Sequence, residues 1–259
     1  MSGDASLVLS VISHGQRELV LLLLDDLQRH VRTRFRLVLT ENFPEGPDFP
    51  VADYPFPIEV IRNELRKGFG ANHNAALGRA DDGWFCVLNP DIRLTADPFP
   101  ALLAAASDAR FGVVAPVVTD PNLVPEDHAR QFPSLFTLVA KAFGHRPRVP
   151  SPVGEAVYRP DWVAGMFMLI RCATMRSLDG FDERYFLYYE DVDLCARIRD
   201  RGLEVVVCTG ASVIHAARRE SRRNLRYAAW HLRSALRVLA SRPGIALGLR
   251  PGRRKPRRP

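Results

Sequence analysis

The chain of 259 residues lacks several features that would place it in a class at once. Its four cysteines stand alone, without a C-x-x-C pair or regular spacing, which indicates small buried residues in a reducing compartment. No apolar run approaches the roughly 20 residues that cross a bilayer, and the longest candidate, Leu19–Leu24, ends at Asp25. Asp4 and the lack of an early basic segment argue against a signal peptide. We therefore expect a cytoplasmic protein that does not cross a membrane.

A glycine-rich phosphate-binding motif is also missing near the N-terminus. A dinucleotide-binding oxidoreductase would carry G-x-G-x-x-G after its first strand. The first predicted strand here, Leu7–Ile12, is followed by Ser13-His14-Gly15-Gln16. This class of enzyme is therefore disfavoured.

Charge is divided unevenly along the chain. The net charge is +7, but residues 216–259 carry fourteen Lys and Arg against one acid, whereas the first 215 residues carry 22 basic and 28 acidic side chains. Such asymmetry predicts an anionic partner for the basic part, either a membrane surface or nucleic acid. Because no recognisable nucleic-acid-binding motif precedes the basic part and the body is acidic, we expect no nucleic-acid partner.

Strand and helix patterns alternate through the first half of the chain. Short apolar runs predict buried strands, and apolar residues at helical spacing predict helices packed on them. The predicted strands are Leu7–Ile12, Phe35–Thr40, Ile58–Ile61, Trp84–Leu88 and Phe111–Val118, and the helices are Glu18–His30, Ala71–Arg79 and Pro98–Ser107. This order predicts an α/β fold with a mostly parallel, Rossmann-like sheet and helices on both faces. In such sheets ligands bind beyond the carboxyl ends of the strands.

The second half is less regular. Residues 121–160 are rich in proline and are interpreted as a long loop with short helical pieces. The later elements are a strand at Trp162–Arg171 interrupted by Gly165, a helix from Glu190 to about Arg201, a strand at Glu204–Val207, an amphipathic helix at Arg219–Ser241 and a disordered end at Arg250–Pro259. We expect one catalytic domain over residues 1–217, and a basic helix and tail over residues 218–259.

Carboxylates at strand ends and helix starts are the first candidates for chemistry. Capping explains Asp193, because acids complement the dipole at a helix N-terminus. It explains Glu190 and Asp191 less well, since two adjacent carboxylates repel each other without a cation or a proton. Asp91 follows a wholly buried strand with proline in the turn, where capping offers no explanation. Asp91 and Asp191 are therefore the leading candidates.

Six motifs follow one another between residues 63 and 215. They are Asn63-x4-Gly68-Phe69-Gly70-Ala71-Asn72-x-Asn74, Leu88-Asn89-Pro90-Asp91, Trp162-x-x-Gly165, Gly180-Phe181-Asp182-Glu183, Phe186-x-x-x-Glu190-Asp191-x-Asp193-Leu194 and His215. In this order they make the chain resemble the family 2 inverting glycosyltransferases of the GT-A fold, especially the branch with rhamnosyl- and galactofuranosyltransferases. The resemblance runs from about Leu7 to His215.

The resemblance implies a metal site after the Trp84–Leu88 strand. Asp91 would bind Mg²⁺ or Mn²⁺ at the donor diphosphate, since hard cations prefer carboxylate and phosphate oxygens. The ion would stabilise the departing nucleoside diphosphate as a Lewis acid. Asn89 replaces the first acid of the family's Asp-x-Asp motif and is expected to contact the substrate. His215 stands where related transferases place a metal-binding histidine, although a lone histidine after a strand is otherwise a surface or supporting residue.

The resemblance also implies roles in catalysis and substrate binding. Asp191 matches the general base that takes the proton of the acceptor hydroxyl, and Glu190 would orient the base or the acceptor. The implied substrate contacts are Ser13, His14 and Glu41 for the nucleoside, Asn63, Phe69, Gly70 and Asn74 for the donor, and Trp162 and Gly165 for the acceptor. Asn74 can equally be a helix-start residue, and Trp162 a core tryptophan.

The expected function is transfer of a sugar from a dTDP- or UDP-linked donor to a saccharide or lipid-linked acceptor in surface polysaccharide biosynthesis, with dTDP-rhamnose favoured. The alternative is a non-catalytic sugar-nucleotide-binding or interaction protein of the same fold, because Asn89 weakens the metal motif. The Arg219–Ser241 helix has an apolar face with arginines among and opposite it. This face either docks on the catalytic domain or lies on the inner face of the cell membrane, where it would hold the protein peripherally.

Overall fold

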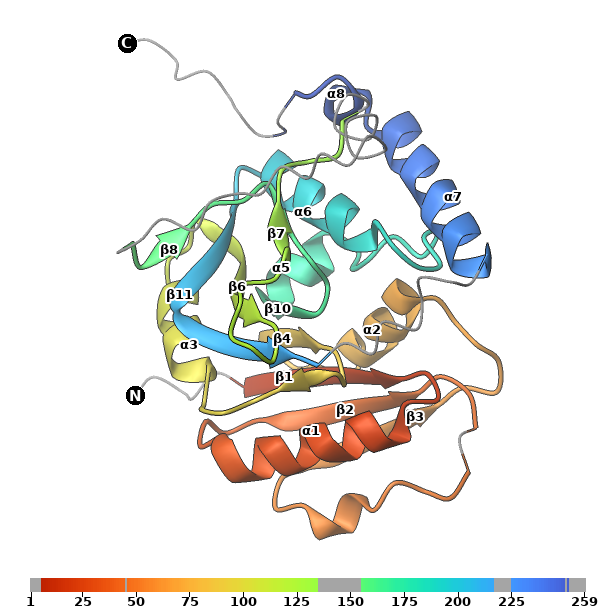
Figure 1. The fold of residues 1–259 in the computed structure, drawn as a ribbon, viewed down its shortest axis with the longest axis vertical. Helices are drawn as coiled ribbons and strands as arrows, with labels where there is room; N and C mark the ends of the chain where they lie inside the picture. The colour runs from red at the N-terminus through yellow and green to blue at the C-terminus, as the bar shows by residue number, and fades with distance from the viewer. Residues whose placement is uncertain (1–5, 45, 135–154, 217–224, 250, 252–259) are drawn as a thin grey trace.

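One mixed sheet forms the centre of the molecule (Figure 1). The computed structural model describes residues 6–44, 46–134, 155–216, 225–249 and 251. The strands run in the order β3-β2-β1-β4-β10-β6-β11-β5. Their bounds are β1 Ser6–Ser13, β2 Arg36–Glu41, β3 Ile58–Arg62, β4 Gly83–Leu88, β5 Ile92–Arg93, β6 Phe111–Thr119, β10 Phe167–Arg171 and β11 Glu204–His215. Two further short strands, β7 Ala129–Arg130 and β9 Trp162–Val163, pair with each other, and β8 Val157–Tyr158 pairs with β11.

The prediction of a mostly parallel sheet is confirmed. The first four strands pair with one another in parallel, and β6 is parallel to β11. The antiparallel strands are β10, which runs between β4 and β6, and the short strands β5 and β8, which both pair with β11. The apolar run that forms β10 is equally compatible with either direction, so its orientation could not be inferred from the sequence.

Helices cover both faces of the sheet, as predicted. Their bounds are α1 Arg17–His30, α2 Phe69–Leu77, α3 Phe99–Ala106, α5 Cys172–Ser177, α6 Glu190–Asp200, α7 Leu225–Ser241 and α8 Pro243–Ala246, with a 3-10 helix at Val51–Asp53. In β1, Leu7 and Leu9 pack in one apolar cluster with α1 and α3, whereas Val8 packs in another with α2 and α6. Successive side chains of a strand point to opposite faces, so a strand covered on both sides is apolar on both. The buried Ser10 of β1 is hydrogen-bonded to His73.

The C-terminal helices share the core of the α2–α6 face. Val238 of α7 and Ile245 of α8 are buried and belong to the same apolar cluster as α6. The predicted start of this helix, residues 219–224, and most of the predicted disordered end lie outside the described residues. Within the described part of the chain, no helix combines the length and apolar character needed to span a bilayer.

Candidate active site

The predicted site residues come from strand ends that meet at one edge of the sheet. Parallel pairing places Ser13 beside Glu41, at the carboxyl ends of β1 and β2. β4 ends at the same edge because it is parallel to β1. Since β10 is antiparallel to β4, its first residue, Phe167, lies opposite Leu88. The antiparallel strand therefore delivers the residues before it, including Gly165, to the edge where ligands bind in α/β sheets.

A short strand pairing brings Asp91 and His215 into contact. In the antiparallel pair β5–β11, His215 lies opposite Ile92, and the backbone N–H of Ala216 donates to the Asp91 carbonyl at 2.9 Å. The side chains follow, with His215 Nε2 donating to Asp91 Oδ2 at 3.1 Å. The two residues named together as metal ligands are therefore neighbours, 124 positions apart in sequence.

Glu126 holds the other side of the same imidazole. His215 Nδ1 donates to Glu126 Oε2 at 2.7 Å. Burial lowers the pKa of His215, but the hydrogen bonds and charges of Asp91 and Glu126 outweigh it and raise the pKa to about 9. Glu126 was not identified from the sequence, because it lies in a loop 89 residues from His215 and no local pattern marks it.

The Asp91–His215 pair fits a divalent cation whose remaining ligands come from substrate. Asp91 Oδ1 is buried and has no hydrogen-bond partner among the described residues, although a buried carboxylate oxygen is normally paired. Among the same residues, no three His, Cys, Asp or Glu side chains converge into a complete metal cage. Magnesium sites commonly use one or two protein carboxylates together with phosphate oxygens and water. An acid with one free oxygen beside a histidine suits such a site.

Asp191 occupies the first turn of α6 with both carboxylate oxygens hydrogen-bonded. Oδ2 accepts from the backbone N–H of Gly165 at 3.0 Å, and Oδ1 accepts from that of Val192 at 2.8 Å. Burial raises the pKa of Asp191 above its ordinary value, and these N–H groups lower it by less. The carboxylate is thus fixed in direction while its affinity for a proton is increased.

Glu190 is more deeply buried than Asp191. Its side chain is 5% exposed, and Oε2 has no hydrogen-bond partner among the described residues. Burial, followed by the charge of Asp191, raises the pKa of Glu190 well above its ordinary value. Burial and the repulsion between the adjacent acids therefore both favour the neutral form of Glu190, while Asp191 is held by two backbone N–H groups.

The backbone that leads into α6 adopts an unfavourable conformation. Tyr188 and Tyr189 have φ angles of 70° and 67°. These lie in the left-handed region, which residues other than glycine rarely adopt. Helix α7 supports this turn, because Ser234 Oγ donates to the Leu187 carbonyl at 3.0 Å, and the ring of His231 lies 5.1 Å from that of Tyr189. Strained backbone of this kind concentrates at functional sites, where surrounding contacts maintain it.

Gly165 and Phe69 lie beside Asp191. A Cβ at Gly165 would stand 3.2 Å from the Phe69 ring and 3.7 Å from Asp191 Cβ. Phe69 is held at the start of α2 by its N–H, which donates to the Phe186 carbonyl at 2.9 Å. A larger residue at position 165 would therefore crowd the Phe69 ring, which favours glycine where the ring and the carboxylate approach each other. The structure brings together these three residues, which the motifs named separately.

Gly70 packs against protein rather than lining open space. A Cβ there would stand 2.7 Å from Phe181 Cβ. The backbone at Gly70 therefore approaches Phe181 closely, and the packing of α2 against this residue explains the glycine. A contact with the donor stays a prediction for Gly70.

The nucleoside end combines buried and exposed polar groups. Ser13 and Glu41 are buried, and Glu41 Oε2 lies 3.3 Å from Arg62 Nε. His14 is exposed and lies at the outer edge of this nucleoside end, which we call the rim. Its Nδ1 accepts from Asn42 Nδ2 at 2.7 Å. Arg66, in the loop after β3, stacks over the Phe43 ring at 3.9 Å. The rim therefore offers aromatic and basic groups beside the predicted nucleoside contacts.

A buried cluster of three asparagines supports this rim. Asn63 Nδ2 donates to Asn42 Oδ1 at 3.0 Å and to Asn72 Oδ1 at 2.7 Å. Asn42 Oδ1 also accepts from the backbone N–H of Lys67 at 2.9 Å. The side-chain hydrogen bonds of Asn63 are thus with the other two asparagines, and the cluster anchors the loop that precedes α2. Asn72 stood in the first sequence motif without an assigned role, and Asn42, directly after β2, stood in none of the motifs.

Two other predicted contacts are engaged within the protein. Asn74 Oδ1 accepts from the Phe181 N–H at 2.8 Å, and Asn74 Nδ2 donates to the Phe181 carbonyl at 2.9 Å. Trp162 is 9% exposed, and its indole N–H donates to the Gln131 carbonyl at 2.9 Å. Asn74 fastens the loop before α6, and Trp162 packs in the core, which was the alternative left open for it. Asn89 is half-buried and tied by its backbone N–H to the Met166 carbonyl at 2.9 Å.

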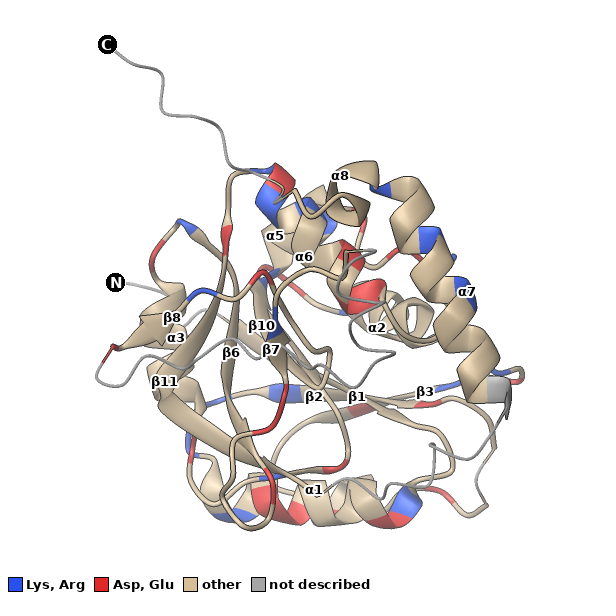
Figure 2. Cartoon of the chain, turned by 45° about the horizontal axis from the view of Figure 1, so that its top comes forward, with Lys and Arg blue, Asp and Glu red and all other residues tan. Residues whose placement is uncertain are grey.

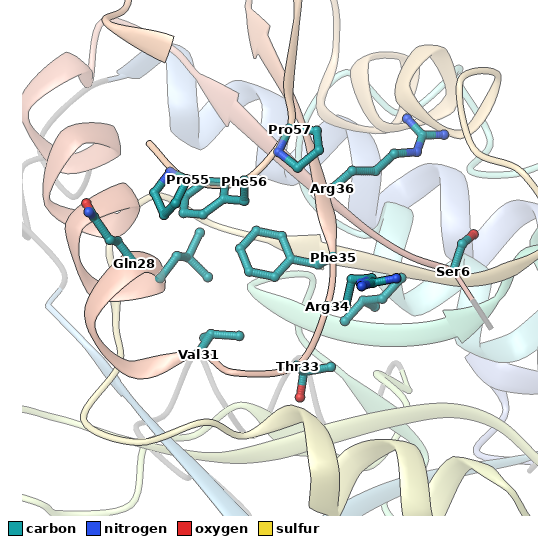
Figure 3. Close-up of a pocket in the computed structure, with 12 residues that line it drawn as sticks. Ser6, Gln28, Val31, Thr33, Arg34, Phe35, Arg36, Pro55, Phe56 and Pro57 are labelled. Carbon is teal, nitrogen blue, oxygen red and sulfur yellow. The ribbon is translucent and has the colours of Figure 1, made fainter. Parts of the chain in front are cut away.

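A hollow of about 530 Å³ lies at the opposite end of the sheet (Figure 3). Val31, Phe35 and Phe56 gather around it, and the residues that line it precede or begin β1, β2 and β3. It contains none of the predicted site residues. The predicted active site at the carboxyl ends of the strands is therefore identified by its polar side chains, and this hollow is not part of it.

Comparisons with known proteins agree with the geometry. Residues 23–153 match the family described as glycosyl transferase family 2. Rhamnosyltransferase WbbL of Escherichia coli (strain K12) is 27% identical over 245 residues, which cover 89% of this chain and 91% of the relative. The N-acetylglucosaminyl-diphospho-decaprenol L-rhamnosyltransferase of Mycobacterium tuberculosis (strain ATCC 25618 / H37Rv) is 36% identical over 190 residues, which cover 65% of this chain and 62% of the relative.

Solved structures show the same fold at low identity. GalNAc-T7 with UDP, GalNAc and Mn²⁺ has a TM-score of 0.74 at 16% identity, over 93% of this chain and 48% of that chain. Mannosyltransferase PcManGT from Pyrobaculum calidifontis, in complex with GDP-Man and Mn²⁺, has a TM-score of 0.64 at 16% identity, over 91% of this chain and 65% of that chain. The fold is GT-A, and with the match across residues 23–153 the chain belongs to glycosyl transferase family 2, in its rhamnosyltransferase-like branch.

Proposed function

We propose that the protein transfers a sugar, with rhamnose from dTDP-rhamnose as the favoured donor, to a saccharide or lipid-linked acceptor in polysaccharide biosynthesis. The observation that carries the proposal is the pair of acidic sites at one sheet edge, Asp91 with His215 and Asp191 with Gly165. Two relatives are rhamnosyltransferases, and the name of one includes a decaprenol-linked sugar. These names support the sugar and the lipid-linked acceptor.

Asp91 and His215 would hold Mg²⁺ or Mn²⁺ at the donor diphosphate. When bound, the ion supplies Lewis-acid stabilisation to the leaving nucleoside diphosphate. Asp91 contributes its unpaired Oδ1, and His215 contributes Nε2 once the proton shared with Asp91 is lost. Two structural neighbours contain Mn²⁺, which supports a divalent ion.

Asp191 would act as the general base. An acceptor hydroxyl is a weak nucleophile, and a carboxylate within hydrogen-bond reach can take its proton as the oxygen attacks the anomeric carbon. The raised pKa of Asp191 makes the carboxylate a stronger base than an exposed one. Gly165 N–H keeps the carboxylate directed, and attack opposite the leaving diphosphate inverts the configuration. Glu190, buried behind it, would orient the base.

The remaining predicted contacts fall into two groups: residues still proposed to touch the substrate, and residues whose polar atoms or packing are already used within the protein. Ser13, His14 and Glu41 remain the proposed nucleoside contacts at the ends of β1 and β2, and Phe69 and Gly165 border the reacting centre. We assign Asn63 to support of the rim, because its side-chain hydrogen bonds are with other asparagines. Gly70, Asn74, Asn89 and Trp162 carry no step of the proposed mechanism.

The first test is a nucleotide panel measured by calorimetry. We expect dTDP to bind more tightly than UDP or GDP, and Mn²⁺ to strengthen the binding. Incubation with dTDP-rhamnose and a polyprenyl-diphosphate-linked N-acetylglucosamine should then release dTDP and yield an inverted glycosidic bond, detected by mass spectrometry and NMR. Binding without transfer to any saccharide or lipid-linked acceptor would favour the non-catalytic alternative. Transfer from a UDP or GDP donor alone would change the donor.

Replacement of Glu126 tests whether it orients His215 toward the metal. Replacing the hydrogen-bonded partner of a metal-binding histidine typically lowers metal affinity by about 10–100-fold. We therefore expect Glu126→Ala to weaken Mn²⁺ binding in the presence of dTDP by about this amount, measured by calorimetry or by Mn²⁺ electron paramagnetic resonance. Glu126→Gln should recover part of the loss, because its amide oxygen still accepts from Nδ1.

Glu59→Ala is the matched control for this prediction. Glu59, on β3, forms ion pairs with Arg36 and Arg79, neither of which is a predicted site residue. Its removal should leave Mn²⁺ affinity unchanged. Equal affinities for Glu126→Ala and the unmodified protein would remove Glu126 from the metal site.

A further inference from the structure

Helix α7 has two differently occupied faces. One face points toward the rest of the protein and carries His231, Ser234, Ala235 and Val238. His231 is half-buried, and the other three are buried. Residues spaced by four lie on the same side of a helix. On the other side Ala228, Ala229, Leu232, Leu236 and Ala240 form an apolar stripe that is exposed along its whole length. One face of α7 therefore docks on the rest of the protein, which was one of the two alternatives posed by the sequence, and the outer stripe takes no part in that contact.

The inner face is fastened to the loop and helix that carry Asp191. Trp230 lies 4.8 Å from the Phe186 ring, in addition to the contacts of Ser234 and His231 with the same loop. After α7, Arg242 donates to Asp193 at 2.9 Å and to Asp200 at 2.8 Å, both on α6. These contacts fix the direction in which the outer stripe faces. They also account for the docking of α7 without using any residue of the stripe.

Four of the large apolar side chains that the described part of the protein leaves exposed lie on the outer face of α7 or directly after α8. Leu232 and Leu236 on α7 are 62% and 59% exposed, and Leu247 and Leu249 after α8 are 74% and 63% exposed. In Figure 1, α7 and α8 lie on the outside of the molecule, beyond α6. Exposed apolar groups gathered on one face mark interaction surfaces, whereas isolated ones are ordinary.

Basic charge accompanies the stripe. Arg233 is exposed beside Leu232 and Leu236, and Figure 2 shows basic residues spaced along α7. The sequence of residues 216–259 adds fourteen basic side chains against one acid, next to a body with six more acids than bases. A second copy presenting the same basic segment would be repelled. An anionic lipid surface matches both the charge and the apolar stripe.

We propose that the outer face of α7, with Leu247 and Leu249, docks on an anionic lipid bilayer. The stripe would insert among the headgroups, and the arginines would contact lipid phosphates. Because the inner face holds the loop before Asp191, docking would place the site next to the bilayer surface. The inference deepens the proposed function by naming the surface that meets a lipid-linked acceptor, and rests on that function only for its biological purpose.

Co-sedimentation of the full chain with vesicles tests this surface. Vesicles of phosphatidylglycerol with phosphatidylcholine should bind the protein at low salt, and phosphatidylcholine alone should bind it much less. Salt should weaken the binding, because surface charges are screened. The double variant Leu232→Ser/Leu236→Ser should bind anionic vesicles at least about tenfold more weakly, from the lost burial of two leucines.

The control is Leu22→Ser/Leu123→Ser, which alters two exposed leucines outside α7 and α8. It should bind vesicles like the unmodified protein, and thermal melting should show both variants folded. Equal vesicle binding by all three proteins, or binding by none, overturns the proposal. Self-association that the stripe variant abolishes, measured by light scattering without lipid, would instead assign the face to a second copy.

Vesicle binding and enzyme activity are read separately. Donor binding by calorimetry is measured without lipid, so loss of vesicle binding with intact dTDP binding rejects only the docking surface. Vesicle binding without any sugar transfer rejects only the proposed function.

Discussion

Asp191→Asn is expected to lower the rate of sugar transfer by about 10²–10⁴-fold, the range for loss of a general base. The amide keeps an oxygen that can accept the Gly165 N–H bond seen at 3.0 Å, but it cannot take a proton from the acceptor. Nucleotide and Mn²⁺ binding should stay nearly unchanged, because the base acts on the acceptor and not on the diphosphate. Steady-state kinetics and calorimetry on the same preparation measure the two effects.

Asp200→Asn is the matched control on the same helix. Asp200 is the last residue of α6 and pairs with Arg242 at its exposed end. Its replacement should alter the transfer rate little. If Asp191→Asn turned over at a near-normal rate, the base would have to be sought elsewhere, first at the neighbouring Glu190.

Asp91→Ala is expected to abolish the dependence of nucleotide binding on Mn²⁺ and to lower kcat/KM by about 10²-fold or more, since a metal ion contributes several kcal/mol to stabilising a leaving phosphate. The variant removes both the unpaired Oδ1 and the oxygen bound to His215. Titration of dTDP with and without Mn²⁺ measures the coupling directly.

His215→Ala should produce a smaller loss of the same kind. If the two residues bind one ion, the double variant should lose less than the sum of the single losses, because neighbouring residues in one network are not additive. Asp53→Ala, an exposed carboxylate of the 3-10 helix, is the control and should keep the Mn²⁺ dependence. Unchanged coupling in His215→Ala would leave Asp91 without this partner.

The sequence by itself determined the main elements and the leading acids. Buried strands such as β1 are apolar on both faces, and this pattern is local, so the strand was recognisable without the fold. Helix α6 was anticipated to within one residue of its end, and Asp91 and Asp191 stood out because capping did not explain them. The order of six motifs added the fold family, which the match across residues 23–153 supports.

Only the tertiary structure decided how these pieces meet. The two-residue strand β5 and the extension of β11 to His215 carry little local signal, yet their pairing creates the Asp91–His215 contact. The same is true of Glu126, whose partner lies 89 residues away. An apolar periodicity reports that a helix has an apolar face, but not what covers it. In α7 one part of the apolar surface packs on the loop before Asp191 and the other stays exposed, because long-range packing, unlike propensity, depends on which surfaces the rest of the chain brings alongside.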